Sequence, residues 1–263
     1  MGECCSLLQV PFGYREAVPE TESPTPSFRS DVTVELVRSS AHDSDVLFAA
    51  RVSTQGEQTL ESAQDADLDA SRSKGLINYL MRDRHGSPFE HNSMTFYVQA
   101  PIFVFREFMR HRIASYNEES GRYRELKPVF YVPGPERNLV QVGKAGAYDF
   151  LPGSPEQTEL AVSEAKRVAT EAYESYQRML DAGIAREVAR IVLPLSIYSS
   201  MYVTVNARSL MNFVSLRTKR EGSHFPSFPQ REIEMAAEKV EDLWAGLMPL
   251  THAAFNENGR VAP

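Results

Sequence analysis

The sequence is poor in cysteine and has no long apolar run. Its only two cysteines, Cys4 and Cys5, are adjacent and close to the N-terminus, which is typical of neither a disulfide framework nor a metal site. The rest of the chain therefore has no thiol nucleophile, and we expect a reducing compartment. No apolar segment is long enough to cross a bilayer, and no basic region followed by an apolar stretch suggests a secretory signal. These absences predict a cytoplasmic protein without a membrane partner.

The sequence also lacks an excess of positive charge. Its formal net charge is −7, which argues against a general nucleic-acid binder because such proteins carry a basic face or tail. Small anionic ligands stay open, since local arginine clusters decide their binding. The 263 residues are 42% hydrophobic, enough for one large domain or two small ones with a substantial core. Residues 1–30 are rich in Pro, Ser, Thr and Glu and are expected to form a disordered extension.

The body of the chain, residues 31–263, is expected to be mixed α/β with more helix than strand. Residue alternation and β-branched or aromatic content predict strands over 31–36, 93–99 and 127–133. Apolar spacing predicts helices over 44–54, 75–84, 102–112, 154–183, 202–217 and 230–248, and the polar segment 54–74 is expected to be a loop. The clearest helix starts with a capping box of Ser154 and Gln157, has Pro155 at its first position and ends at Gly183.

A cation-rich segment, RHRIASYNEESGRY at 110–123, contrasts with the acidic balance. The five arginines between 106 and 124 could be surface charge balanced by nearby glutamates, as is usual in charged loops. Here they surround ESGR (119–122), a small turn that exposes backbone N–H groups and a hydroxyl. Guanidinium groups match the oxygens of a phosphate. The residues alone leave both an anion site and a solvated loop open.

The triplet Arg110-His111-Arg112, followed after seven residues by Ser120, resembles the signature of the flavin-dependent thymidylate synthases. Further segments resemble family elements in the expected order: ARVS (50–53), HGSPFEH (85–91), EVARIVLP (187–194) and NARSLMNFVSLR (206–217). The resemblance runs from about Ser53 to the final helix. It implies the family's fold, a mixed central sheet flanked by long helices, with 31–263 as a single catalytic domain.

The resemblance implies that dUMP is converted to dTMP, with 5,10-methylenetetrahydrofolate supplying the carbon and FAD, reduced by NADPH, supplying the hydride. The missing thiol agrees with this, because the cysteine-dependent thymidylate synthases add a cysteine to uracil C6, whereas here the cofactor carries the difficult chemistry. No GxGxxG or P-loop is present, so the flavin site should differ from a Rossmann site. The resemblance also implies a homotetramer with sites between subunits.

Residue roles follow from the resemblance, motif by motif. The expected flavin contacts are Ser53, Ser87, Glu90, Arg110, His111, Arg112, Ile113, Glu118, Asn206, Ala207, Arg208 and Asn212. The expected nucleotide contacts are Glu107, Arg110, Glu118, Glu119, Ser120, Gly121, Arg122, Arg190 and Arg217. The expected catalytic residues are Arg217 against the pyrimidine N3 and O4, Ser120 beside the uracil, and His85 near the flavin ring.

Several of these residues have simpler interpretations. The triplet Arg110-His111-Arg112, called the arginine triplet below, could be a solvated helix end, where cations suit the helix dipole. Arg190 could pair with Glu187. HGSPFEH could hold a metal, but HExxH spacing and a third ligand group are missing, so no metal is expected.

Ser120 has no adjacent base that would make it a nucleophile. A guanidinium at Arg217 would stabilise a uracil anion.

Two features depart from the family pattern. Glu107 stands where some members carry glutamine, and the connection 218–229 is longer than expected, so it could cover a site or contact a neighbouring subunit. Asn206 and Arg217, eleven residues apart, should share a helix face. Two rival functions remain: the same methylation of UMP, and a non-catalytic RNA- or nucleotide-binding module.

Overall fold

The computed structural model describes residues 24–57, 70–144 and 147–263. At its centre is a four-stranded sheet with the strand order β2-β3-β8-β4, in which every neighbouring pair is antiparallel. Its strands are β2 (Thr33–Ser40), β3 (Ser93–Pro101), β4 (Ser115–Glu118) and β8 (Tyr198–Val205). This order places the strand that follows the arginine triplet beside the strand that precedes the segment 206–217.

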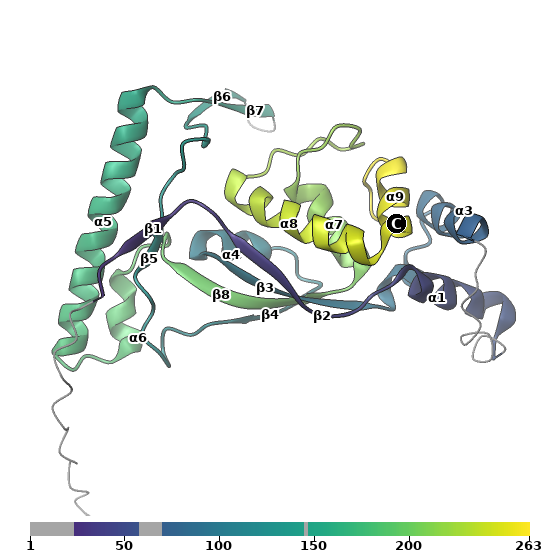
Figure 1. Cartoon of the computed structure of the whole chain (residues 1–263), viewed down its shortest axis with the longest axis horizontal. Helices are drawn as coiled ribbons and strands as arrows, with labels where there is room; N and C mark the ends of the chain where they lie inside the picture. Colours follow the sequence, from purple (N-terminus) through teal and green to yellow (C-terminus); the bar gives the residue numbers. More distant parts are fainter. Residues whose placement is uncertain (1–23, 58–69, 145–146) are drawn as a thin grey trace, which may run out of the picture.

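The helices gather on one face and at the two ends of this sheet (Figure 1). Those on the covered face are α4 (Ile102–Phe108), α7 (Ala207–Arg217), α8 (Arg231–Leu247) and α9 (Pro249–Glu257). Those towards the ends are α1 (Asp43–Gln55), α3 (Ala70–Arg82), α5 (Pro155–Asp181) and α6 (Arg186–Ala189), with short 3-10 turns η1 (Ser87–Glu90) and η2 (Arg190–Val192). The expected mixed α/β fold with more helix than strand is confirmed.

Two small pairings complete the fold. β1 (Ser27–Arg29) runs parallel to β5 (Val129–Tyr131), and β6 (Val140–Lys144) forms an antiparallel hairpin with β7 (Ala147–Leu151). The hairpin lies near the start of α5, the long helix at the opposite end of the molecule from α1 and α3 (Figure 1).

The central sheet separates an apolar face from a polar one. In β3, Met94, Phe96 and Val98 are fully buried in the main core beneath the helices, because side chains alternate between the two faces of a strand. On the other face, the Tyr97 and Tyr202 rings meet edge to face at 6.1 Å, and Tyr202 is 49% exposed. Within the described part of the chain, no helix lies over this second face (Figure 1).

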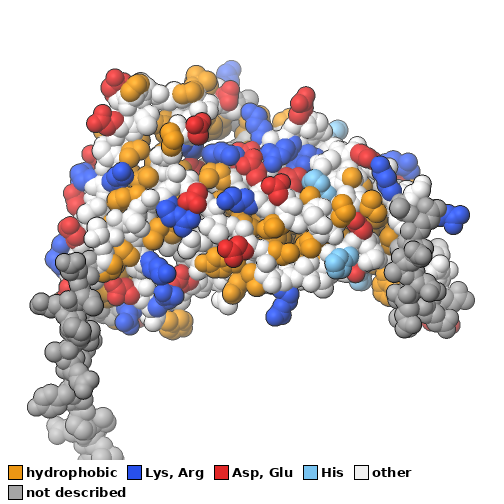
Figure 2. Space-filling view, viewed as in Figure 1, with side chains coloured by type: hydrophobic (Ala, Val, Ile, Leu, Met, Phe, Trp, Pro, Cys, Tyr) orange, Lys and Arg blue, Asp and Glu red, His pale blue; other side chains and the backbone are white. Residues whose placement is uncertain are grey.

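The side chains on the surface seen in Figure 2 mix both charges. Lys and Arg side chains are interspersed with Asp and Glu across the middle of this view, so the cations do not form a continuous basic stripe. The distribution agrees with the acidic net charge.

The long helix α5 follows its local sequence signals. Ser154 Oγ accepts from Gln157 N at 3.2 Å, and Gln157 Oε1 accepts from Ser154 N at 2.8 Å. Gly183, just beyond the helix, has a φ of 78°, which favours glycine. The predicted capping box and helix end are confirmed. The strands expected near 31–36, 93–99 and 127–133 and the helix over 230–248 are also present.

Other predictions were wrong at element boundaries. Residues 202–205 were expected to be helical but belong to β8, where Val203, Thr204 and Val205 pair with β3; β-branched residues favour strands. The helix expected over 102–112 ends at Phe108, so the arginine triplet lies in a loop. Helix α3 begins at Ala70 and not at residue 75, and α9 was not predicted.

The first residues of the chain were expected to be disordered up to residue 30. Within that range, residues 27–29 form β1 and pair with β5, so the ordered chain begins before residue 31. Residues 1–23 of the expected extension, including Cys4 and Cys5, lie outside the described residues, as does 58–69 within the expected loop.

A buried charged cluster fixes the end of the chain against α7 and α8. Arg260 lies 2.6 Å and 3.0 Å from the two Glu241 carboxylate oxygens and donates to Thr218 Oγ1 at 2.9 Å. Thr218 directly follows Arg217, so the cluster anchors the helix end that carries this predicted catalytic arginine. The longer connection 218–229 also packs here, since His224 N donates to the Gly259 carbonyl at 2.9 Å.

Candidate active site

The loop 109–114 joins α4 to β4 and carries the arginine triplet. Helix α4 has only seven residues, and β4 pairs immediately afterwards with β8, so the loop is fixed at both ends. Arg110 and Arg112 are exposed, whereas His111 is partly buried. The alternative interpretation as a solvated helix end fits Arg110 and Arg112, which are exposed just beyond the end of α4, but not His111, which is partly buried.

Arg217 is the last residue of α7 and is bound to the chain segment around this loop. Its Nη1 lies 2.5 Å from Glu107 Oε2, and its Nε donates to His111 Nε2 at 3.1 Å. The side chains of Arg217 and Glu107 are only 14% and 23% exposed. The structure thus brings three predicted site residues into one half-buried cluster.

The charges in this cluster are shaped by burial. Burial, with the nearby Arg217 guanidinium, lowers the pKa of His111 from 6.5 to about 4. Its ring is therefore neutral at pH 7, and Nε2 can accept a hydrogen bond from the guanidinium. Burial raises the pKa of Glu107, while Arg217 opposes that rise. The cluster therefore holds a guanidinium against one carboxylate and one neutral imidazole.

A second group of predicted residues lines an open cavity of about 550 Å³. Five of the expected flavin contacts lie there: Glu90, Ile113, Asn206, Arg208 and Asn212. Four residues that the sequence interpretation missed complete the wall: Arg84, Ser209, Ala262 and Pro263. Residues from four separate segments converge on this cavity, as a ligand site requires.

Arg208 organises the cavity wall. Its Nη1 lies 2.5 Å from Glu90 Oε1, and its Nε donates to the Pro263 backbone oxygen at 2.7 Å. A Cβ placed on Gly86 would come within 2.5 Å of the Arg208 guanidinium carbon and 2.7 Å of the Pro263 oxygen. The absence of a side chain at Gly86 is therefore what lets Arg208 lie there.

The N-terminus of α7 also faces this cavity. Asn206 is the N-cap, and its Oδ1 accepts from Ser209 N at 2.9 Å. Ala207 is buried, and its N–H donates to Asn92 Oδ1 at 2.8 Å. Since a helix N-terminus favours anions, the Asn206 and Arg208 end of the cavity suits a negatively charged group.

The third group is the predicted nucleotide loop, 118–122. Gly121 is buried, and a Cβ there would lie 3.3 Å from Arg190 Cδ. Burial raises the pKa of Glu118, and the positive charge of Arg190 opposes that rise. Within the part of the chain that the structure describes, Glu187 pairs with Arg122 at 3.0 Å, and the alternative ion pair between Arg190 and Glu187 is absent.

Glu119 and Ser120 also form hydrogen bonds or ion pairs. Glu119 pairs with Arg124 at 3.0 Å and accepts from Ser200 Oγ at 3.2 Å. Ser120 Oγ accepts from Arg122 N at 3.3 Å. Glu118 and Glu119 line a shallow cavity of about 260 Å³ that opens beside Tyr97 and Tyr202. The loop therefore borders the uncovered face of the sheet.

Three predicted residues stand apart from these groups. Ser53 is exposed near the end of α1 and donates to the Ala50 carbonyl at 3.1 Å. His85 is exposed and meets the Tyr79 ring edge to face at 5.4 Å. Ser87 is exposed at the start of η1. Among the described residues, no hydrogen bond or ring contact joins Ser53 or His85 to the other predicted site residues.

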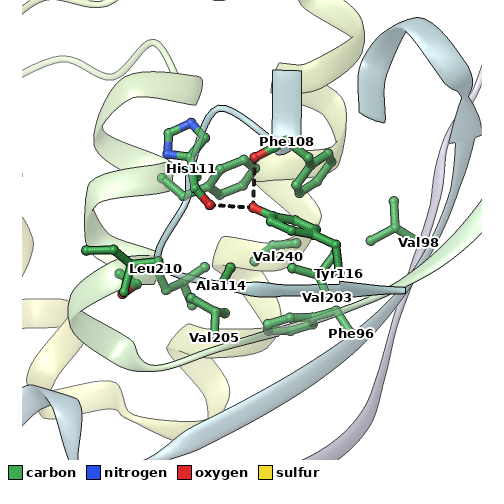
Figure 3. A pocket seen from close by; sticks show the side chains of 13 residues that line it. Phe96, Val98, Phe108, His111, Ala114, Tyr116, Val203, Val205, Leu210 and Val240 are labelled. Carbon is green, nitrogen blue, oxygen red and sulfur yellow. Dashed lines mark hydrogen bonds between the residues drawn. The ribbon is translucent and has the colours of Figure 1, made fainter. Parts of the chain in front are cut away.

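A small apolar pocket of about 20 Å³ lies under the loop 109–114 (Figure 3). It is lined by core side chains of β3, β8 and α7, by Tyr116 from β4, and by His111 and Ile113. Ile113 and Ser209 line both this pocket and the 550 Å³ cavity, so the two spaces adjoin.

Comparison with known proteins settles the family. A family model described as thymidylate synthase complementing protein matches residues 35–250. The chain belongs to this family. The expected family resemblance is confirmed.

Relatives of this thymidylate synthase family cover almost the whole chain. A flavin-dependent thymidylate synthase from Streptomyces coelicolor is 68% identical over 243 residues, 92% of this chain and 98% of the relative. One from Tropheryma whipplei is 61% identical over 238 residues, 90% of this chain and 98% of the relative. Among solved structures, the UMP/dUMP methylase PolB from Streptomyces cacaoi bound with 5-Br dUMP is 58% identical, with a TM-score of 0.84 over 90% of this chain and 99% of that chain.

Two further properties bear on the predicted absences. No helix in the described ranges is both long and apolar enough to span a membrane. Within the same ranges, no three His, Cys, Asp or Glu side chains gather in a way that could hold a metal ion.

Proposed function

We propose that this protein methylates dUMP at C5 to give dTMP, using FAD, 5,10-methylenetetrahydrofolate as carbon donor and NADPH as reductant. The observation that carries the proposal is the 68% identity, over 92% of the chain, to a flavin-dependent thymidylate synthase. Residues 31–263 would act as a single catalytic domain, and we place the protein in the cytoplasm.

The 550 Å³ cavity fits a flavin nucleotide by the chemistry of its wall. Arg208, Asn206 and the α7 N-terminus offer donors that suit a pyrophosphate, and Ile113, 76% exposed at the cavity, offers an apolar surface to a ring. Glu90 would hold the Arg208 guanidinium in place. Bound FAD supplies the hydride, so that no cysteine has to attack the pyrimidine.

The nucleotide would bind between the loop 118–122 and Arg217. Arg190 lies against buried Gly121. The Arg190 guanidinium and the backbone N–H groups next to Gly121 would bind a phosphate. Arg217, held in place by Glu107 and His111, would stabilise negative charge on the uracil oxygens and nitrogen. Ser120 would lie beside the ring, without attacking it.

The same geometry accommodates the rival substrate. The PolB methylase was solved with 5-Br UMP as well as 5-Br dUMP, and the former structure is 55% identical, with a TM-score of 0.84 over 91% of this chain and 100% of that chain. We favour dUMP because the more similar relatives are named thymidylate synthases. Parallel turnover assays decide: a strong preference for UMP would overturn the choice of dUMP.

We also propose a homotetramer with sites between subunits. Ser53 and His85 lie apart from the other predicted residues within one chain, which suits a site completed by a second copy. The uncovered sheet face next to the nucleotide loop offers a surface for such contact. Gel filtration should give a mass near four times the 29.6 kDa chain, and a mass near one chain would contradict the assembly.

The cheapest test is a visible absorption spectrum of the purified protein, followed by turnover with dUMP, methylenetetrahydrofolate and NADPH. A bound-flavin spectrum and dTMP formation are expected. The RNA-binding rival predicts a colourless protein with salt-sensitive RNA binding and no turnover, and the formal net charge of −7 disfavours it. A colourless protein that takes up neither FAD nor pyrimidine nucleotide would refute the proposed function.

A further inference from the structure

Tyr116, a residue with no role in the proposed reaction, reaches from the sheet to the arginine-triplet loop. It lies in β4 opposite Val203 of β8, so its backbone is fixed by strand pairing. Its hydroxyl oxygen is 2.7 Å from the Phe108 carbonyl oxygen and 2.7 Å from the His111 carbonyl oxygen. Figure 3 shows both contacts, with the ring pointing under the loop.

These two carbonyls lie at the start of the loop and in its middle. Phe108 is the last residue of α4, where a helix leaves carbonyl groups without helical partners. The Phe108 carbonyl also accepts from His111 N at 2.9 Å. The Tyr116 hydroxyl, with one hydrogen shared between the two oxygens, therefore closes a tight turn around residues 108–111.

The tyrosine is suited to a constant role as donor. Its ring lines the apolar pocket together with Phe96 and Val98, and burial raises its pKa from 10.0 to about 12. The hydroxyl consequently keeps its proton throughout the neutral and mildly alkaline range.

The turn that Tyr116 closes connects the two parts of the site. The His111 ring lies edge to face against Phe213 at 5.0 Å and accepts from Arg217. Ile113, two residues later, lines the 550 Å³ cavity. A shift of the loop would move the guanidinium partner and the cavity wall together.

We propose that Tyr116 is a positioning residue: its hydroxyl fixes the loop 109–114 so that His111 and Ile113 hold the geometry needed for nucleotide and flavin binding. The ligand-binding part rests on the proposed function, whereas the fixing of the loop does not.

The test compares Tyr116→Phe with Tyr198→Phe. Both variants lose one oxygen that donates to a backbone carbonyl, since Tyr198 donates to the Asp31 carbonyl at 2.5 Å at the far end of β8. We expect Y116F to weaken FAD binding, followed by flavin fluorescence, about tenfold, and to raise the KM for the nucleotide, because the His111 carbonyl would lose the hydrogen bond that holds it in the native turn. Y198F should leave both constants unchanged. Thermal unfolding of the two variants checks that any loss of stability is comparable.

The rate of trypsin cleavage after Arg110 and Arg112 measures how firmly the loop 109–114 is fixed when no ligand is bound. In flavin-free protein, we expect Y116F to be cut there several-fold faster than the wild type and Y198F. Unchanged cleavage overturns the proposal, whether or not the wild type binds flavin. Faster cleavage with unchanged FAD binding and KM overturns the positioning role. If Y116F does not fold, hydrogen exchange in the wild type decides: the His111 amide must exchange as slowly as the β4 amides, and fast exchange refutes the fixed turn.

Discussion

Replacing Arg217 with methionine should destabilise the flavin-free protein as well as abolish turnover. The change removes the guanidinium 2.5 Å from Glu107 Oε2 and the donor to His111, and leaves the Glu107 carboxylate partly buried without its cation. Exposed ion pairs contribute about 0–1 kcal/mol, and breaking a buried one costs about 3–5 kcal/mol. With 14% and 23% exposure, we expect the free energy of unfolding to fall by about 2 kcal/mol.

Neutralising Glu107 as well should recover much of this loss, because a buried amide needs no counter-charge. A double-mutant cycle of Glu107→Gln and Arg217→Met should therefore give a coupling free energy of about 1.5 kcal/mol. Turnover should survive E107Q better than R217M, because Arg217 is proposed to contact the uracil, whereas the glutamine that replaces Glu107 can still accept a hydrogen bond from Arg217.

Urea unfolding of the flavin-free variants, at one fixed protein concentration, measures the cycle. The matched control is the exposed pair of Arg167 and Glu171, 2.9 Å apart at 53% and 63% exposure, whose coupling should be below about 0.5 kcal/mol. Additive effects of E107Q and R217M, within about 0.5 kcal/mol, would refute the inference that burial makes this pair matter. So would equal turnover by R217M and the wild type.

Three further predictions concern the same site. Burial lowers the pKa of His111 from 6.5 to about 4, so the stability that its neutral form contributes is complete above pH 6.5 and is lost as the pH falls towards 4. In the flavin-free protein, His111→Asn should therefore reduce the dependence of the unfolding free energy on pH, by up to about 3 kcal/mol at pH 4. An unchanged pH dependence would contradict the buried neutral ring. Gly86→Ala should displace the Arg208 guanidinium, because the new Cβ would lie 2.5 Å from the guanidinium carbon, and should therefore weaken FAD binding at least tenfold. The control is Gly75→Ala, whose new Cβ would meet nothing within 4 Å, and it should leave the FAD Kd unchanged. Arg190→Met should raise the KM for the nucleotide about tenfold or more with little change in flavin absorbance, since loss of a charged hydrogen bond costs about 1.5–3 kcal/mol; an unchanged KM would remove this arginine from the phosphate site.

Local signals in the sequence predicted those parts of the fold that local interactions decide. The capping box of Ser154 and Gln157 and the glycine after α5 specify helix ends through contacts within four residues. The segment 202–205 was misassigned because a strand depends on its partners: Val203 is opposite both Phe96 and Tyr116, and neither neighbour is visible in a linear window. The early end of α4 likewise depends on tertiary contacts of its last carbonyl.

The candidate site was predictable as residue types but not as an arrangement. The signature triplet identified His111, and the segment NARSLMNFVSLR identified Arg217, yet their contact spans 106 positions and depends on how α7 packs. Ala262 and Pro263, in the wall of the larger cavity, carry no chemical signal in the sequence and could be found only from the fold. Arg84 borders the HGSPFEH segment and has a φ of 65°, a left-handed backbone conformation that is strained for a residue other than glycine. The sequence gives no sign of this conformation.

Helix α7 has one end at the 550 Å³ cavity and the other at the Arg217 guanidinium, so it acts as a rigid spacer between them. Eleven residues at about 1.5 Å each set that span to roughly 16 Å. One residue inserted into it would turn its two ends against each other by about 100° and would take Arg217 away from its partners while the other end stayed capped. The length of this helix is therefore expected to tolerate no change, even where its individual side chains do.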